Sequence, residues 1–171
     1  MDISRLKNRA IARLITYFPS IAKKLVNSYT PWESENSPWT PVKKLLRDSR
    51  VAVVTTAGVH HTDQNPFNMY DKDGDPAFRV IDAIRPLSDL MITHDYYDHS
   101  DADKDINIVF PINILKEFER EGIIGSVADR HYGLMGHITG RHIHTLINVT
   151  ARKVTNILKS DGVDIALLTP G

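Results

Sequence analysis

Threonine, glycine and histidine gather in segment 55–64, directly after a run of apolar residues. The candidate substrate-binding residues of this segment are Thr55, Thr56, Gly58, His60 and His61. Glycine lets a backbone approach a ligand closely, and the surrounding amides and hydroxyls could hold a carboxylate. The segment matches neither GxGxxG nor GxxxxGKS/T, so it is not a nucleotide-binding motif. The alternative interpretation is a strand-end turn with two solvated histidines.

A second polar segment, 93–105, combines two histidines with five aspartates. Its candidate substrate-binding residues are His94, Asp98 and His99, which resemble part of the zinc-binding HxHxDH loop of metallo-β-lactamase-type hydrolases. Tyr96 occupies the position of the middle histidine, and a zinc site needs further ligands. A metal-dependent hydrolase is therefore one alternative function. The same residues could instead form an acid–base pair, or cap turns.

Arginine and glycine characterise a third segment, in which Arg130, Gly133 and Gly136 are the candidate binding residues. Glycine-rich backbone before a helix can bind an anion through free amides, and an arginine can clamp a carboxylate. A flexible connection that leads to a capped helix is the alternative interpretation.

Apolar runs and turn residues predict the elements that must position these segments. We expect strands at 51–58, 78–81, 90–93, 123–128 and 163–168, and helices at 2–18, 20–27, 41–48, 111–121 and 143–160. This alternation predicts an α/β fold with an open, mostly parallel sheet and helices on both faces, Rossmann-like and three-layered. An N-terminal helical segment precedes it.

The predicted order also divides the chain. Residues 1–49 would form helices and a Pro/Trp linker, and 50–171 an α/β domain that is incomplete at its C-terminus. Ligands of such sheets bind beyond the carboxyl ends of the strands. We therefore expect loops 55–64 and 93–105 and the terminal residues 169–171 to meet at one sheet edge.

The composition excludes several functional classes. Lys+Arg and Asp+Glu number 21 each, so the 171-residue chain has no net charge and no broad footprint for nucleic acid. It has no cysteine, hence no disulfide and no thiol nucleophile. We expect no membrane span and a cytoplasmic location. The basic N-terminal helix would dock on the domain, or else serve a non-catalytic binding or assembly module, a second alternative function.

Several motifs in one order resemble a known family. They are 53–60 (VVTTAGVH), 74–81 (GDPAFRVI), 97–107 (YDHSDADKDIN), 109–111 (VFP), 122–125 (GIIG) and 133–136 (GLMG). Together they resemble the selenoprotein B group of the glycine/sarcosine/betaine/D-proline reductases, from about residue 50 to residue 171. The resemblance implies reductive cleavage of a C–N bond in a small amino acid or an N-methylated relative.

The same resemblance implies the chemistry and the partners. A selenocysteine or cysteine attacks the α-carbon and displaces the amine, which a pyruvoyl-containing partner subunit holds. A selenoprotein or thiol partner supplies the reducing electrons. The nucleophile follows a strand like 164–168, so we expect it directly after Gly171. The chain itself would then hold no catalytic residue, cofactor or metal and be inactive alone. It would also form homo-oligomers through its uncovered sheet surface.

A selenocysteine codon, UGA, is expected directly after the codon for Gly171, with further family sequence in frame beyond it. Sequencing the gene past that position is the measurement. A different stop codon, or the absence of family sequence downstream, would contradict this expectation. A deliberately shortened chain is the alternative.

Overall fold

A computed structural model describes residues 3–18, 20, 23–24, 27 and 40–171. Half of the predicted helix 20–27 and most of the Pro/Trp linker lie outside the described residues. The first predicted helix is confirmed as α1 (Ile3–Tyr17). None of the described helices is both long and apolar enough to cross a membrane.

Strand β1 (Arg50–Thr55) is the centre of the main sheet, as the apolar run predicted. It pairs in parallel with β7 (Ile165–Thr169) along five residues, from Val51 opposite Ile165 to Thr55 opposite Thr169. Its two ends pair in parallel with β5 (Ser126–Val127) and β6 (Arg130–Gly133). The remaining strand, β3 (Arg79–Asp82), is antiparallel to β6. The sheet is therefore mixed and mostly parallel.

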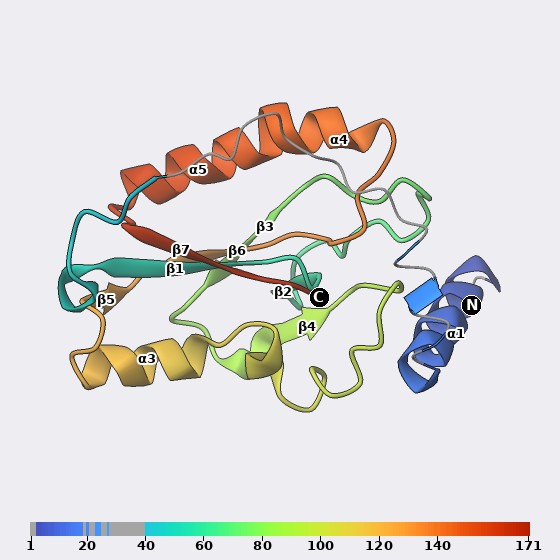
Figure 1. The fold of residues 1–171 in the computed structure, drawn as a ribbon, viewed down its shortest axis with the longest axis horizontal. Helices are drawn as coiled ribbons and strands as arrows, with labels where there is room; N and C mark the ends of the chain where they lie inside the picture. The colour runs from blue at the N-terminus through green and yellow to red at the C-terminus, as the bar shows by residue number, and fades with distance from the viewer. Residues whose placement is uncertain (1–2, 19, 21–22, 25–26, 28–39) are drawn as a thin grey trace.

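Helices cover β1 from two sides (Figure 1). Val53 packs in one core cluster with Ile112 of α3 (Ile112–Arg120), whereas Val54 packs in another with Val154 of α5 (Ala151–Ser160). Consecutive side chains of a strand point to opposite faces, so neighbouring valines serve different clusters. The predicted helix 143–160 is confirmed as a continuous run of α4 (His142–Thr145), the π-helical η4 (Leu146–Thr150) and α5. This arrangement confirms a mixed α/β fold with an N-terminal helix.

A second, two-stranded sheet joins β2 (Val59–His61) to β4 (Leu90–Ile92) in antiparallel fashion. Strand β4 was predicted, but β2 was predicted as polar loop. The interpretation of His60 and His61 as solvated is wrong, because both side chains are buried. Hydrogen bonds satisfy both ring nitrogens of His60 and the Nε2 of His61, whereas His61 Nδ1 has no partner among the described residues.

Three further predictions need correction. The predicted helix 41–48 is only the 3-10 helix η1 (Leu46–Asp48), and the predicted strand 123–128 is shortened to β5. Ile123 and Ile124 donate their amides back to Phe118, so they close the end of α3 instead of extending a strand. The predicted loop 131–140 begins with β6. The sequence of β6 is polar and predicted a loop, but His131 and Tyr132 are buried. Short 3-10 helices at η2 (Leu87–Asp89) and η3 (Ile106–Ile108) complete the elements.

Gly133 should be essential for stability, because an added Cβ would lie 1.9 Å from the carbonyl oxygen of Val59. We predict that Gly133→Ala lowers the free energy of unfolding by about 3 kcal/mol or more in urea denaturation. Gly122→Ala is the matched control, since nothing lies within 4 Å of its Cβ and only its positive φ (70°) is strained. That strain costs about 1 kcal/mol. Equal losses for the two variants would refute the steric argument.

Candidate functional site

The carboxyl ends of the parallel strands meet the two predicted loops at one edge of the sheet. The amide of Thr56 donates to the carbonyl of Thr169 at 2.9 Å. A Cβ at Gly171 would lie 2.5 Å from Ala57 Cα, and one at Gly136 would lie 3.5 Å from His94 Nε2. We call the group of Thr56, Ala57, His94, Gly136 and Gly171 the strand-end site.

His94 is the buried titratable side chain of the strand-end site, with 5% of its surface exposed. The amides of Tyr96 and Gly136 approach its Nδ1 and Nε2, each at 3.2 Å. Burial, followed by the charges of His137 and His99, lowers the pKa of His94 to about 4, so the ring is neutral at pH 7. A neutral imidazole accepts at one nitrogen only. The other therefore carries an N–H that faces a backbone amide.

Tyr97 connects the loop of His94 to the end of β1. Its hydroxyl donates to the carbonyl of Ala57 at 3.0 Å, and its ring lies edge-to-face with that of His94, with centroids 4.9 Å apart. Burial raises the pKa of Tyr97, so the hydroxyl stays protonated and remains a donor. Tyr97 was not among the predicted site residues, although it begins one of the family-like motifs.

His99 and Asp98 lie farther along the same loop and are bound within it. The His99 Nδ1 contacts Asp103 Oδ2 at 2.8 Å, and the amide of Ser100 donates to Asp98 at 3.2 Å. Hydrogen bonding by Ser100 lowers the pKa of the Asp98 carboxyl. Among the residues that the structure describes, no three His, Asp or Glu side chains are placed to hold a metal ion. The metal-dependent hydrolase therefore has no structural support in the described part of the chain.

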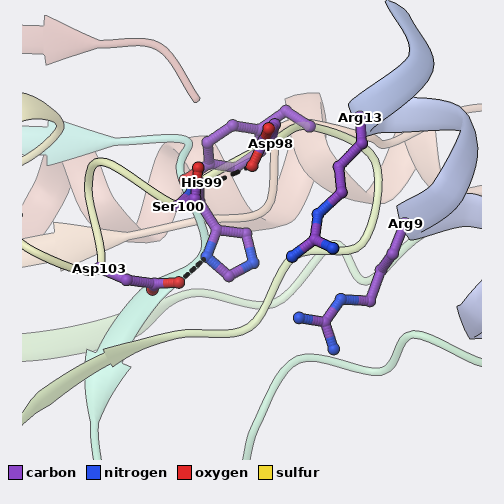
Figure 2. A pocket seen from close by; sticks show the side chains of 7 residues that line it. Arg9, Arg13, Asp98, His99, Ser100 and Asp103 are labelled. Atoms are coloured by element: carbon purple, nitrogen blue, oxygen red, sulfur yellow. Dashed lines mark hydrogen bonds and ion pairs between the residues drawn. The ribbon is translucent and has the colours of Figure 1, made fainter. Parts of the chain in front are cut away.

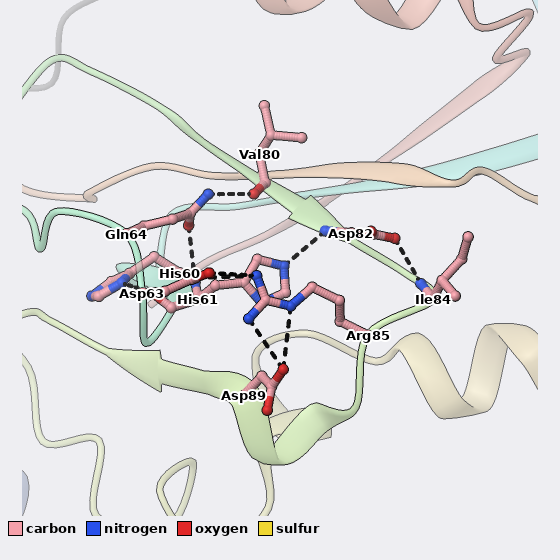
Figure 3. Close-up of polar contacts among 9 residues, drawn as sticks. All are labelled: His60, His61, Asp63, Gln64, Val80, Asp82, Ile84, Arg85 and Asp89. Carbon is pink, nitrogen blue, oxygen red and sulfur yellow. Dashed lines mark hydrogen bonds and ion pairs between the residues drawn. The ribbon is translucent and has the colours of Figure 1, made fainter.

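His60 and His61 form a buried polar network behind the strand-end site (Figure 3). His60 Nδ1 donates to the carbonyl of His61 at 2.7 Å, so its Nε2 accepts from the Thr93 hydroxyl at 2.8 Å. His61 Nε2 accepts the amide of Asp82 at 2.9 Å. The bond of His60 holds Thr93, the residue before His94, whereas the bond of His61 holds β3. His60 thus positions the loop of His94 from within the protein.

The other candidate residues also serve the backbone around the site. Thr55 is buried and its hydroxyl accepts the amide of Ala57 at 3.2 Å. Gly58 has φ 76°, and a Cβ there would lie 2.5 Å from the carbonyl oxygen of Thr93. Gly133 makes the equally close approach to Val59 described above.

The structure does not bring Arg130 to the strand-end site. Arg130 begins β6 near the amino ends of the parallel strands and forms a two-pronged ion pair with Asp161, after α5. Gly133 ends the same strand beside Thr55. Of the third predicted segment, only Gly136 reaches the strand-end site.

A comparison with protein families places this geometry in context. The family model described as glycine/sarcosine/betaine reductase selenoprotein B matches residues 8–171. The chain belongs to this family. The match includes residues 8–17 of α1 as well as the α/β part, so this portion of the N-terminal helix is shared family sequence.

Several curated relatives in this selenoprotein B family are similar to the chain. The D-proline reductase subunit gamma of Acetoanaerobium sticklandii is 41% identical over 133 residues, which cover 78% of this chain and 53% of the relative. The sarcosine reductase complex component B subunit beta of Peptoclostridium acidaminophilum is 28% identical over 73% of this chain and 29% of its own length. The glycine reductase complex component B subunit gamma of Symbiobacterium thermophilum is 30% identical over 56% and 22%.

The chain thus spans about half the length of the D-proline reductase subunit and less than a third of the other two relatives. No solved structure matches it significantly. Sequence similarity therefore establishes the family. The geometry of the strand-end site comes from this chain alone, because no solved structure matches it.

Buried histidines should make this family member sensitive to acid. Burial lowers the pKa of both His94 and His131 to about 4, from an ordinary value of 6.5. Between these values the unfolded chain binds more protons than the folded one. The free energy of unfolding should therefore be highest above about pH 6.5. It should fall by about 3 kcal/mol per histidine as the pH decreases to about 4.

Urea denaturation from pH 7.5 to pH 4 measures this dependence. His131→Gln, which removes one buried imidazole, should reduce the slope, whereas His144→Gln, at an exposed position of α4, should leave it unchanged. An unchanged slope for His131→Gln would show that another group causes the acid sensitivity.

Proposed function

We propose that this chain forms part of an amino-acid reductase subunit that cleaves the C–N bond of a small amino acid or an N-methylated relative. The nucleophile in this proposal is a selenocysteine, or a cysteine, at the position directly after Gly171. Membership of the selenoprotein B family supports the reaction class. The complete domain would be a three-layer, Rossmann-like α/β unit in the cytoplasm.

The observation that carries the proposal is the contact between the end of β7 and the end of β1. Gly171 lies so close to Ala57 that a side chain at position 171 would overlap the Ala57 backbone. The position after Gly171 therefore follows a glycine that lies against the backbone of Ala57, just beyond the end of β1. A selenolate or thiolate there would lie near the His94 ring, which contacts the amides of Tyr96 and Gly136, and near the Tyr97 hydroxyl, which donates to Ala57.

The proposed reaction assigns separate tasks to the groups. As the nucleophile forms a bond to the α-carbon, the C–N bond breaks, and the amine leaves with the bonding electrons and takes up a proton. A selenoprotein or thiol partner then supplies two electrons that release the product from the nucleophile. A pyruvoyl group on a partner subunit would hold the substrate amine. Thr56, His94 and Gly136 of this chain would bind and orient the reactants, and His60, His61 and Tyr97 would hold these residues in place.

Assembly with other subunits is part of the proposal. The glycine and sarcosine reductase relatives are named as subunits of component B of a complex. In this chain Leu168 of β7 is 73% exposed, beside an apolar groove whose lining includes Ile143, Leu146 and Leu158. Such a surface favours contact with another subunit, including a second copy of this chain.

Activity of the native complex tests the proposal. A complex isolated from its host through a tag on this subunit should release amine or open the ring of one of D-proline, glycine, sarcosine and betaine, with dithiothreitol as reductant. His94→Gln should lower kcat by at least about tenfold, because a preorganised donor is lost. His144→Gln is the matched control on an exposed helix face and should leave kcat unchanged.

Three results would contradict the proposal: no cleavage of any of the four compounds, full activity of His94→Gln, or the absence of selenium and of cysteine after Gly171 in the peptide mass spectrum. Addition of a metal chelator should not change the rate. Loss of activity on chelation would restore the metal-dependent alternative.

A further inference from the structure

Helix α1 is fixed to the loop of the candidate site by a buried carboxylate. Arg5 donates to Asp95 through Nε at 2.5 Å and through Nη2 at 3.2 Å, and the Asp95 side chain is only 3% exposed. The hydrogen bond that Arg5 donates to Asp95 is the main cause of the raised pKa of Arg5. Asp95 follows His94 directly, so the ion pair ties α1 to the strand-end site. Two-pronged pairs of this kind are geometrically specific.

Two more arginines follow on the same face of α1, at the helical spacing of four residues. Arg9 and Arg13 line a small cavity of about 30 Å³ together with residues of the opposite loop, namely Tyr97, Asp98, His99, Ser100 and Asp103. Figure 2 shows both guanidinium groups directed from α1 toward His99. The cavity has room for one small polar group rather than for a whole amino acid.

The carboxylates that line this cavity have hydrogen-bond partners, whereas the guanidinium groups have no ion-pair partner among the described residues. Asp98 accepts the amide of Ser100, and Asp103 contacts the ring of His99. In the part of the chain that the structure describes, by contrast, neither Arg9 nor Arg13 forms an ion pair. Arg13 lowers the pKa of Asp98 through its charge without contacting it. Neither guanidinium group at this cavity is therefore paired with a carboxylate among the described residues.

We propose that Arg9 and Arg13 bind the carboxylate of the amino-acid substrate at this cavity. The inference rests on the proposed function and identifies which part of the substrate is recognised, and by which residues. Guanidinium groups match the planar carboxylate and bind it through paired hydrogen bonds. On the opposite wall Asp98 is bonded to the Ser100 amide and Asp103 to His99, so the two guanidinium groups remain to bind the substrate carboxylate, the one group that the cavity would admit.

Tyr97 links this cavity to the strand-end site. Its ring lines the cavity, and its hydroxyl donates to Ala57, the residue that Gly171 contacts. A substrate whose carboxylate lies between the two arginines would have its remaining atoms near Tyr97, on the side where the nucleophile is proposed. The basic face of α1, on which Arg9 and Arg13 are exposed, would thus contribute substrate-binding residues.

Calorimetric titration of the 171-residue chain tests the inference directly. The probes are D-proline, glycine, sarcosine and betaine, each paired with its amide, which keeps the amine and loses the carboxylate charge. We expect at least one amino acid to bind, its amide to bind about tenfold more weakly or worse, and the double variant Arg9→Gln/Arg13→Gln to lose affinity by a similar factor. Arg9→Lys/Arg13→Lys should retain part of the affinity.

The control variant Lys7→Gln/Lys153→Gln removes two positive charges from exposed positions and should bind as the unaltered chain does. Unfolding curves would show that the variants remain folded, since Arg5 and Asp95 are untouched. The inference is overturned by equal binding of acid and amide, by unchanged affinity of the Arg9→Gln/Arg13→Gln variant, by preference for inorganic phosphate, or by no binding at all.

Kinetics of the native complex separate this inference from the proposed function. If both hold, Arg9→Gln/Arg13→Gln raises KM about tenfold or more while kcat changes less. Cleavage with an unchanged KM would overturn the role of the arginines and leave the reductase proposal standing. Carboxylate binding that depends on both arginines, in a complex that cleaves none of the four compounds, would overturn the reductase and leave the binding site.

Discussion

The parallel pairing of β1 with β7 is the interaction on which the rest of the structure depends. Five consecutive residue pairs align the two strands, so both carboxyl ends arrive at the same edge. β1 tolerates this central position because Val51, Ala52 and Val53 are almost fully buried and need no solvent-exposed face. Without that pairing the backbone of Gly171 would not lie against Ala57, and the strand-end site would have no common edge.

Close backbone contacts hold the loops together at this edge of the sheet. At Gly58, Gly133 and Gly171 a Cβ would lie within 2.5 Å of a backbone atom of another segment. Each contact joins segments that are distant in sequence: β2 with Thr93, β6 with Val59, and β7 with Ala57. Glycine is required at these points because any side chain would separate the layers. The loops carrying His94 and Gly136 are consequently held by backbone geometry as well as by hydrogen bonds.

The histidines divide into two kinds according to burial. His60, His61 and His131 have ring nitrogens bonded to backbone groups or to Thr93, and they stabilise the core. His99 lines the cavity beneath α1, and His94 is buried with both ring nitrogens in contact with backbone amides. Residue type alone does not distinguish these roles, since the burial of a neutral imidazole depends on partners that come from other strands.

The sequence by itself determined the family, the central strand β1, the helices α1, α3 and α5, and the segments that meet at the sheet edge. Apolar periodicity and motif order are local properties, so they can be read without coordinates. Only the tertiary structure decided that β2 and β6 are strands, that Arg130 pairs with Asp161 away from the site, and that Arg9 and Arg13 face His99. These features depend on contacts between residues 30 or more positions apart, and the pattern of one segment carries no information about its distant partners.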